Sequence, residues 1–600
     1  MKIKGLDYLR FFGIFLVISY HFFPEALPGG FLGVNILFVL SGFLITFHLI
    51  DELFTEGKIS YKNFYFKRFI RIFPPILLMV FLVTIFSGLL NKDYTVRYFD
   101  QFLAAISFNY NIFEILRGGS YEGQFVKSLF MHTWSLAIEV HFYLVWPFVL
   151  SLIFKKAKEK RAIKRRFSSI LIYSSFFIYL ISYLLMVGLS LSNKVDRGFV
   201  YFSFFTRIGS FALGAILASF VKRFSFRQIP YNKNTIACSL MIFALALIFS
   251  YDSNTTYYFG FLLTDLITAY LILVAYSNKN LMEDKIMAKA SNYSYGIYVF
   301  HWPVFVMISS KLDRNIALIL TIILTAILVL FNYHIFEKVF VGKDIRSIRR
   351  PEKVFSFDKN SLLIQSSIAF MFIASFTLAI AISDASGDLN SLERQIMTQS
   401  VNQDIDKIIL DKKSLENQLN FQRDSDLAKA KKELSITLLA DSVILGNREH
   451  LANNIKNLYI NAEGSRPLEN AADLIREIDQ SGNLGDIVVI ALGTNARKEP
   501  RESLKAIVDS LSRGKRLILV TCYDNRYEQP HRVSKAMEEI SKKYDFITLM
   551  PWEEEGIKHP EYYKGTDGVH FYGNFDAYDA YLKLLEKAID QSLVKPAKGE

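Results

Sequence analysis

The sequence predicts a polytopic α-helical membrane domain followed by an α/β domain with a parallel sheet. Three observations predict this pair of folds. The 600-residue chain is 52% hydrophobic, with 54 Phe and a mean hydropathy of +0.24. Apolar runs of membrane-spanning length fill its first 383 residues, and short β-rich runs alternate with helix-like segments only after residue 433. Such a composition excludes an ordinary soluble enzyme and suits a membrane protein with a soluble appendage.

About eleven apolar runs approach the ~20 residues that a helix needs to cross a bilayer. They cover residues 8–23, 31–50, 75–91, 134–154, 168–190, 203–221, 234–250, 259–277, 295–311, 315–336 and 361–383. The first run follows the basic stretch MKIK but precedes no small-residue cleavage site. We therefore interpret it as a retained span and not as a signal peptide.

The basic residues are concentrated in the first part of the chain. Residues 1–383 carry 39 Lys+Arg against 21 Asp+Glu, whereas residues 384–600 carry 30 against 36. Basic loops alternate with loops that carry few or no basic residues. The positive-inside rule predicts a multi-pass protein of the cell membrane with a cytoplasmic N-terminus, and an odd number of spans then places the C-terminal domain outside the cell. The lipid bilayer is the expected partner of these basic loops, and nucleic acid is not.

Four segments follow from these patterns. They are a membrane domain at 1–340, a basic cytoplasmic loop and the last span at 341–383, a polar linker at 384–433, and an extracellular domain at 434–600. The extracellular domain is long enough for one hydrophobic core. It contains five β-rich runs, SITLLA, LYINA, DIVVIAL, RLILVTC and FITLM, separated by helix-like segments. This alternation predicts a parallel sheet.

Polar side chains follow three of the predicted strands. Ser442 follows the first, Gly493 to Asn495 follow the third, and Asp567 and His570 come after the last. Loops at the carboxyl edge of such a sheet can converge. Ser, His and Asp are the components of an acyl-transfer site, in which His takes the serine proton and Asp orients the imidazole.

Each of these features has a plainer interpretation when it is taken alone. Ser442 could be a helix cap, and Gly493 to Asn495 could form a turn. Asp567 and His570 could belong to a surface loop or to half of a metal site. The ordered set, with each member beyond a strand end, favours the catalytic interpretation.

The order of Asp-Ser, Gly-x-Asn and Asp-x-x-His resembles the SGNH family of esterases and acetyltransferases. The resemblance implies that Ser442 is the nucleophile and that Asp567 and His570 complete its triad.

The same resemblance implies an oxyanion hole. Its donors would be the backbone N–H of Ser442, the side chain of Asn495, and a backbone N–H of either Gly464 or Ser465, of which we prefer Ser465. Ala440 stands where the family usually has Gly.

The first apolar run carries two ionisable residues, Arg10 and His21. They are eleven residues apart and therefore share one helix face, about 16 Å from each other. Because such groups are costly inside a bilayer, they indicate a functional site. The alternative is that both side chains reach opposite membrane interfaces.

Further charged residues stand at the ends of later spans. Arg68 and Arg71 precede Pro-Pro, where they could bind lipid headgroups or the phosphates of a cytosolic donor. Glu139 lies among apolar residues and needs a partner such as an arginine. Arg207 and His301 stand in two later spans.

These strings resemble the acyltransferase-3 family of membrane acyltransferases over roughly residues 1–340. The resemblance rests on Arg10 and His21, on the block GGFLGVNILFVLSGFLI, on RxxR before Pro-Pro, and on WSLAIEVHFY. Asn35 stands where the family often has Asp, and Val140-His141 where it often has Glu-Gln. The whole architecture resembles the peptidoglycan O-acetyltransferases of Gram-positive bacteria, of the streptococcal type.

The resemblance implies an O-acetyltransferase that moves acetyl from cytoplasmic acetyl-CoA to the cell wall. The donor site would comprise Arg10, His21, Arg68, Arg71 and Glu139. His21, with Arg10 nearby, would serve the step at the cytoplasmic face. The acetyl group would cross by a carrier that the sequence does not identify. It would then pass through a serine acyl-enzyme to peptidoglycan, at the 6-hydroxyl of N-acetylmuramic acid.

Two other functions remain open. One is O-acetylation of another surface polysaccharide, such as a capsule, an exopolysaccharide or a lipopolysaccharide. The other is a transporter fused to a deacetylating esterase. Acetyl-CoA is expected as the acyl donor and not as a bound cofactor. The chain has only two cysteines, Cys238 and Cys522, so neither a disulfide nor a metal site is expected.

Overall fold

The structure is a computed structural model, in which the chain divides into two compact units, Met1–Asp388 and Leu389–Glu600. It describes residues 3, 5–87, 92–117, 128–158, 162–192, 195–224, 227–278, 285–338, 359–386, 394, 398, 434–497, 499–525, 528–564 and 566–600. Of the expected segments, residues 341–358 of the basic loop and last span at 341–383, and most of the linker at 384–433, therefore lie outside the described residues. Each unit is described by itself.

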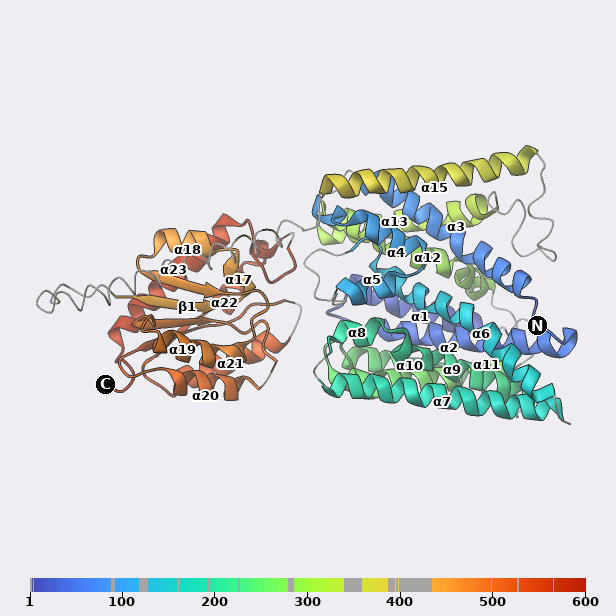
Figure 1. Cartoon of the computed structure of the whole chain (residues 1–600), viewed down its shortest axis with the longest axis horizontal. Helices are drawn as coiled ribbons and strands as arrows, with labels where there is room; N and C mark the ends of the chain where they lie inside the picture. Colours follow the sequence, from blue (N-terminus) through green and yellow to red (C-terminus); the bar gives the residue numbers. More distant parts are fainter. Residues whose placement is uncertain are drawn as a thin grey trace, which may run out of the picture. The chain divides into compact units, whose positions relative to one another are not determined.

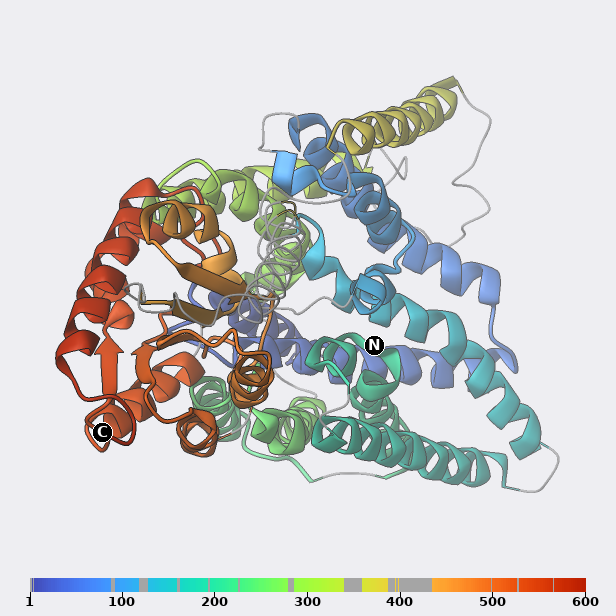
Figure 2. The same ribbon diagram turned by 60° about the vertical axis from the view of Figure 1, so that its left-hand side comes forward.

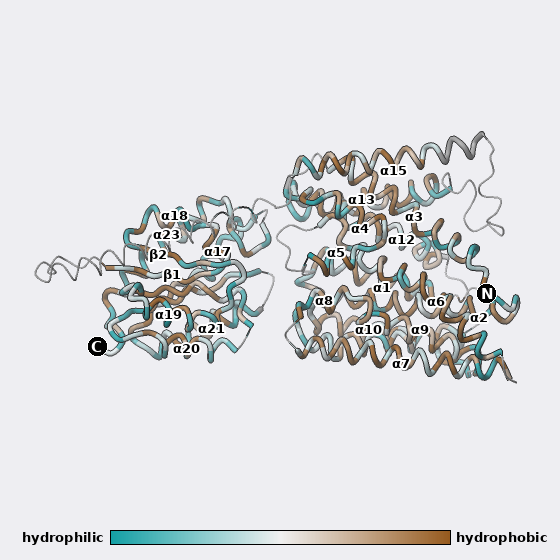
Figure 3. The backbone as a smooth tube through the Cα atoms, in the orientation of Figure 1, coloured by the Kyte–Doolittle hydropathy of each residue, from teal (hydrophilic) through white to brown (hydrophobic). Residues whose placement is uncertain are grey.

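The first unit is a bundle in which long helices run side by side (Figure 1). Its helices are α1 (Leu6–Phe22), α2 (Gly33–Glu56), α3 (Tyr61–Ser87), α4 (Tyr98–Ile106), α5 (Tyr110–Arg117), α6 (Trp134–Lys158), α7 (Ile163–Ser192), α8 (Arg197–Phe202), α9 (Phe204–Arg223), α10 (Tyr231–Ile248), α11 (Phe261–Ser277), α12 (Lys285–Ser309), α13 (Arg314–Phe331) and α15 (Lys359–Ser386). Hydrophobic residues predominate along these helices (Figure 3). The helix α15 lies at the edge of the bundle, against α3 and α4 (Figures 1 and 2).

Nine helices in the described part of the chain are long and apolar enough to cross a membrane. They coincide with nine of the expected spans, which confirms a polytopic helical domain. The expected spans at 8–23 and 295–311 are also helical, as α1 and α12. However, α1 has only 17 residues, and α12 begins with the polar stretch KIMAKASNYSYG. The short helices α4, α5 and α8 were not predicted, because they are too short to give a periodic signal.

The glycines of the block GGFLGVNILFVLSGFLI bring helices together. A Cβ at Gly33 would lie 2.3 Å from the carbonyl oxygen of Gly13 in α1, and one at Gly42 would lie 2.2 Å from that of Phe211 in α9. Small residues at such crossings let two backbones approach closely. The block therefore packs α2 between α1 and α9, at the centre of the bundle.

The second unit contains a five-stranded parallel sheet with the order β2-β1-β3-β4-β5. Its strands are β1 (Ile436–Ala440), β2 (Leu458–Ala462), β3 (Ile487–Ala491), β4 (Arg516–Val520) and β5 (Ile547–Met550). Its helices are α17 (Ser442–Leu445), α18 (Arg448–Asn454), α19 (Ala471–Gln480), α20 (Pro500–Ser510), α21 (Glu528–Ser541), α22 (Trp552–Lys558) and α23 (Phe575–Val594). All five predicted strands are confirmed.

Two hydrophobic cores cover the two faces of this sheet. Along β1, Leu438 belongs to the core that includes α18 and α23, whereas its neighbour Leu439 belongs to the core that includes α19, α20 and α21. Figure 1 shows these helix groups on opposite faces. Successive strand residues point to opposite faces, so a strand buried on both sides is apolar throughout. This explains the unbroken apolar runs in the sequence.

The strand order β2-β1-β3 makes β1 the point at which the direction of the connections reverses. The chain passes from β1 to β2 on one side of the sheet and then to β3 on the other. The connections after β1 and β3 therefore diverge at this point, where open α/β sheets bind their ligands. Ser442 follows β1, and Asn495 follows β3.

Candidate functional site

Ser442 lies at the turn that follows β1. The side chain of Asp441 caps α17 by accepting a hydrogen bond from the backbone N–H of Val443, at 3.1 Å. The hydroxyl oxygen of Ser442 lies instead 2.8 Å from Nε2 of His570. The helix-cap interpretation of Ser442 is therefore wrong, because its neighbour fills that role.

The loop that follows α22 brings Asp567 and His570 to Ser442. The Nδ1–H of His570 donates to Oδ2 of Asp567 at 2.8 Å. The other carboxylate oxygen accepts the backbone N–H groups of Val569, at 3.1 Å, and His570, at 2.9 Å. Asp567 thus fixes the imidazole with its Nε2 lone pair towards the serine hydroxyl, which is the arrangement that lets histidine act as a general base.

The triad is buried in the folded domain. Ser442 is 6% exposed and His570 is 5% exposed, and the side chain of Asp567 is 1% exposed. A charge that develops in such a site interacts more strongly with nearby dipoles than it would in water.

Two polar contacts tie the neighbouring loops to the Ser442 turn. The hydroxyl of Thr494, in the loop after β3, donates to Oδ2 of Asp441. Arg466, in the loop after β2, donates to the carbonyl oxygens of Ala440, at 3.3 Å, and Asn461, at 2.7 Å. The connections after β1, β2 and β3 are therefore fixed to one another at the sheet edge.

The carboxyl of Asp441 is buried beside the triad. Burial raises its pKa above the ordinary value, whereas the hydrogen bonds from Thr494 and Val443 and the charge on His570 act in the opposite direction. The capping role of Asp441 was not predicted, although Asp before a helix start is a known capping signal.

The residues predicted as oxyanion donors lie on these same loops. Gly464 and Ser465 follow β2, and Ser465 adopts a left-handed conformation with φ of 57°. The amide of Asn495 donates to the hydroxyl oxygen of Thr494, at 3.1 Å. A Cβ at Gly493 would lie 2.3 Å from Sγ of Cys522, so only glycine fits there without a shift. The oxyanion role of Ser465 and Asn495 stays a prediction.

In the membrane unit, Glu139 receives hydrogen bonds from hydroxyl groups. Ser41 Oγ donates to its Oε1 at 2.6 Å, and the Tyr143 hydroxyl donates to the same oxygen. The guanidinium of Arg68 lies 5.5 Å from the ring centroid of Tyr143 and interacts with Glu139 through its charge. Glu139 thus has Arg68 as a charged neighbour, whereas its direct hydrogen bonds come from Ser41 and Tyr143.

Arg10 lies near this cluster at the start of α1. Its Nη1 donates to Oγ of Ser291 at 3.0 Å and lies 3.9 Å from Oδ1 of Asp7. It interacts through its charge with both Arg71 and Glu139. Arg10 and Arg68 thus each interact through their charges with Glu139 and with Arg71, and the role of these residues in donor binding stays a prediction.

His21 belongs to a different cluster, near the end of α1. Its Nδ1 lies 2.7 Å from Nε2 of His301 in α12, and the two rings are nearly parallel, with centroids 5.0 Å apart. The Trp302 ring lies 4.6 Å from it. His132 approaches His301 edge-on, at 5.9 Å. In the described residues, no group of three or more His, Cys, Asp or Glu side chains is arranged to hold a metal ion.

Arg10 and His21 both lie in α1, as predicted, and their joint role in a donor site stays a prediction. The two residues lie about 16 Å apart along one helix, and each has its own set of neighbours. The sequence did not reveal that His301 contacts His21, because these residues lie on helices separated by most of the membrane domain.

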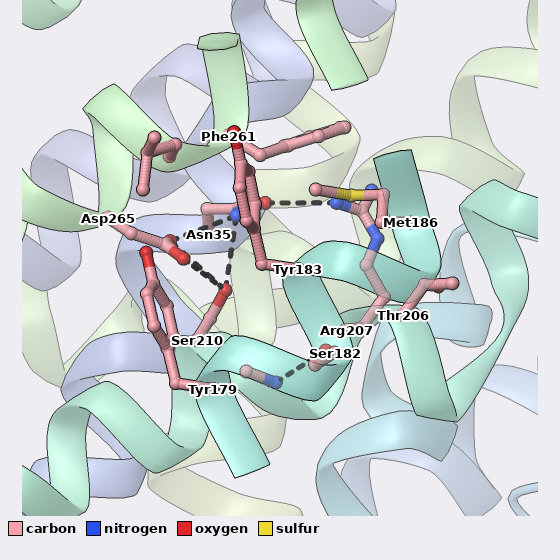
Figure 4. Close-up of a pocket in the computed structure, with 12 residues that line it drawn as sticks. Asn35, Tyr179, Ser182, Tyr183, Met186, Thr206, Arg207, Ser210, Phe261 and Asp265 are labelled. Atoms are coloured by element: carbon pink, nitrogen blue, oxygen red, sulfur yellow. Dashed lines mark hydrogen bonds between the residues drawn. The ribbon is translucent and has the colours of Figure 1, made fainter. Parts of the chain in front are cut away.

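Asn35 and Arg207 meet in a buried polar cluster (Figure 4). Arg207 Nη1 donates to Oδ1 of Asn35 at 3.4 Å, and Asn35 Nδ2 donates to Oδ1 of Asp265 at 3.0 Å. Ser210 donates to the same carboxylate at 2.9 Å. The carboxylate of this cluster belongs to Asp265, in α11.

The cluster contains one basic and one acidic side chain, Arg207 and Asp265. Arg207 and Asp265 are 2% and 4% exposed, and the cavity beside them offers about 20 Å³ to water, room for roughly one molecule. Arg207 and Asp265 are connected through the side-chain amide of Asn35, and these hydrogen bonds and the opposite charges offset part of the cost of burying two charged groups. We interpret the cluster as a structural junction of α2, α9 and α11. Asp265 could have been noticed as the one acidic residue in the apolar run FLLTDLITAYLILVAYS.

Comparison with known proteins gives three findings. An acyltransferase domain model matches residues 3–334. The chain is 26% identical over 604 residues to "O-acetyltransferase OatA" of Staphylococcus aureus (strain MRSA252), covering 97% of this chain and 96% of that protein. It is also 26% identical to "Putative peptidoglycan O-acetyltransferase YrhL" of Bacillus subtilis (strain 168), covering 95% of each.

Among solved structures, the chain is similar to the C-terminal catalytic domain of Streptococcus pneumoniae peptidoglycan O-acetyltransferase A, solved with a methylsulfonyl adduct. The identity is 28%, and the match covers 28% of this chain and 100% of that one, with a TM-score of 0.27.

Proposed function

The chain belongs to the acyltransferase family whose domain model spans residues 3–334, and we propose that it transfers acetyl groups to hydroxyls of cell-wall peptidoglycan. The single observation that carries this proposal is the buried Asp567–His570–Ser442 chain of hydrogen bonds. The membrane acyltransferase domain would carry out the first step, in which acetyl leaves its cytoplasmic donor. The Ser-His-Asp triad would carry out the second step, in which acetyl reaches the glycan. The relatives that match over nearly the full chain are named for O-acetyl transfer, one of them to peptidoglycan.

The outer reaction proceeds by a serine acyl-enzyme. His570 takes the proton of the Ser442 hydroxyl as Oγ attacks the acetyl carbonyl, and it returns this proton to the departing group. A sugar hydroxyl then attacks the acetyl-serine, and His570 takes its proton and gives it back to Oγ. The backbone N–H of Ser442 and of Ser465, with the Asn495 side chain, would hold the oxyanion.

The membrane half supplies the acetyl group. The positive-inside rule places the N-terminus in the cytoplasm and the C-terminal domain outside. Arg10 and the cluster of Arg68 and Arg71 would then bind the phosphates of acetyl-CoA near the cytoplasm. The pantetheine arm of CoA is long enough to separate these phosphates from the thioester, so the acetyl group can reach His21 farther along α1. Arg10 and His21 would thus contact different parts of the same acetyl-CoA molecule, the phosphates and the acetyl group.

The acceptor is the 6-hydroxyl of N-acetylmuramic acid. The experiment measures ester-linked acetate on purified peptidoglycan and on other surface polysaccharides, in cells with and without this protein. Loss of wall acetate supports the proposal. Loss confined to another polysaccharide assigns the activity to that glycan, and a gain of wall acetate identifies a deacetylating esterase.

A further inference from the structure

The contact between His21 and His301 joins Nδ1 of one imidazole to Nε2 of the other. His301 is 1% exposed and His21 is 6% exposed. The Nδ1 of His301 lies 3.0 Å from the carbonyl oxygen of Ile297 and 2.9 Å from that of Tyr298. A carbonyl oxygen can only accept a hydrogen bond, so this nitrogen carries a proton.

The second nitrogen of His301 is then an acceptor. An imidazolium buried among aromatic rings is costly, which favours neutral His301 with its lone pair on Nε2. That lone pair lies 2.7 Å from Nδ1 of His21, and the contact requires His21 to donate. Neutral His21 therefore carries its proton on Nδ1 and its lone pair on Nε2.

We propose that His301 is a positioning residue that fixes this tautomer and ring orientation of His21. The relationship repeats that of Asp567 and His570, in which Nδ1–H donates and Nε2 reacts. His301 is a neutral acceptor, so it orients the ring more than it stabilises an imidazolium. The inference rests on the proposed role of His21 in the membrane step, and the reactive lone pair is on Nε2 whether His21 acts there as base or as nucleophile.

The packing around the pair supports a positioning role. The rings of His21 and His301 are nearly parallel, with an interplanar angle of 11°. Trp302 lies against His21 at 4.6 Å, and Phe22 lies against His301 at 6.1 Å. Ring contacts alone would hold the imidazole in place but would leave both tautomers available. The acceptor nitrogen of His301 is the feature that distinguishes them.

The test compares two substitutions in the full-length protein. His301→Gln places an amide oxygen near the position of Nε2 and keeps an acceptor for His21. His301→Phe keeps the ring contacts and removes the acceptor. Acetyl transfer is followed in membranes with labelled acetyl-CoA and a soluble glycan, and hydrolysis of a soluble acetyl ester in the same membranes reports the amount of folded outer domain.

We expect His301→Phe to lower acetyl transfer by about 100-fold or more, because loss of an imidazole-orienting group has an effect of this size or larger in catalytic triads. We expect His301→Gln to retain at least tenfold more activity than His301→Phe. Equal activity in the two variants at normal abundance, or higher activity with Phe, would overturn the proposal. Where Phe lowers abundance, His301→Asn serves instead, because its shorter side chain cannot reach Nδ1 of His21. His21→Ala separates the two claims, since full transfer in that variant would refute the role of His21 itself.

Discussion

The hydroxyl of Thr494 donates a hydrogen bond to the buried carboxylate of Asp441. This contact links the loop after β3, which carries Asn495, to the turn that carries Ser442. The relative positions of the nucleophile and a predicted oxyanion donor thus depend on a pair of residues that take no part in the reaction.

Replacing Thr494 should show how much this link contributes. Thr494→Val leaves a buried carboxylate oxygen without its donor, so the outer domain should lose about 1–3 kcal/mol in its free energy of unfolding. Thr494→Ser keeps the hydroxyl and should lose far less. Denaturant unfolding of the isolated domain, residues 434–600, measures both variants. Equal stability of the Val and Ser variants would contradict the account.

Asp441 should make the stability of the domain depend on pH. Burial raises its pKa in the folded state, so the folded domain binds this proton more tightly than the unfolded chain does. Protonated Asp441 therefore contributes to the free energy of unfolding. This contribution is fully present below the ordinary Asp pKa of about 3.9, and it is lost as the pH rises through the folded-state pKa.

The Asp441→Asn variant does not titrate at this position. Relative to the variant, the wild-type domain should therefore lose stability as the pH rises through this window. Unfolding free energies of both proteins at a series of pH values provide the measurement. A constant difference, or one that changes in the opposite direction, would refute the assignment.

Asp567 should matter through the orientation of His570. Asp567→Asn replaces the oxygen that accepts from Nδ1–H and favours the wrong imidazole tautomer, so hydrolysis of an activated acetyl ester should fall by about 10³–10⁴-fold. Circular dichroism checks that the domain remains folded. A rate within tenfold of wild type would exclude the triad.

The orientation of the chain in the membrane can be tested with protease. With the C-terminal domain outside, protease added to wall-stripped but intact cells should cut between residues 384 and 433 and release the domain. A cytoplasmic marker protein controls for lysis. Protection in intact cells, with cleavage only after lysis, would reverse the orientation and remove the need for a transfer across the membrane.

Local patterns were enough to predict much of this architecture. Apolar runs long enough to cross a bilayer indicate membrane-spanning helices directly, and the five strands follow from runs that are buried on both faces. Ser442, Asp567 and His570 could be predicted together because Ser442 directly follows the first strand and the Asp-x-x-His pair comes after the last, and the topology of a parallel sheet can bring such loops to one edge.

Contacts between distant helices could not be predicted in this way. His21 and His301 are 280 residues apart in the chain, and no local periodicity relates them. The same holds for Arg207, Asn35 and Asp265, which come from three helices. The packing role of Gly33 could not be predicted either, because it depends on the close approach of Gly33 to Gly13 in another helix.

The most direct test of the proposed function is to trap the acyl-enzyme on Ser442. The isolated domain is mixed with an activated acetyl ester, and its peptides are analysed by mass spectrometry before and after a soluble muramic-acid-containing glycan is added. We expect one acetyl group on the peptide that contains Ser442, its loss when the glycan is added, and the appearance of acetyl ester on the glycan. An acetylated glycan formed at the normal rate by the Ser442→Ala domain would contradict the account.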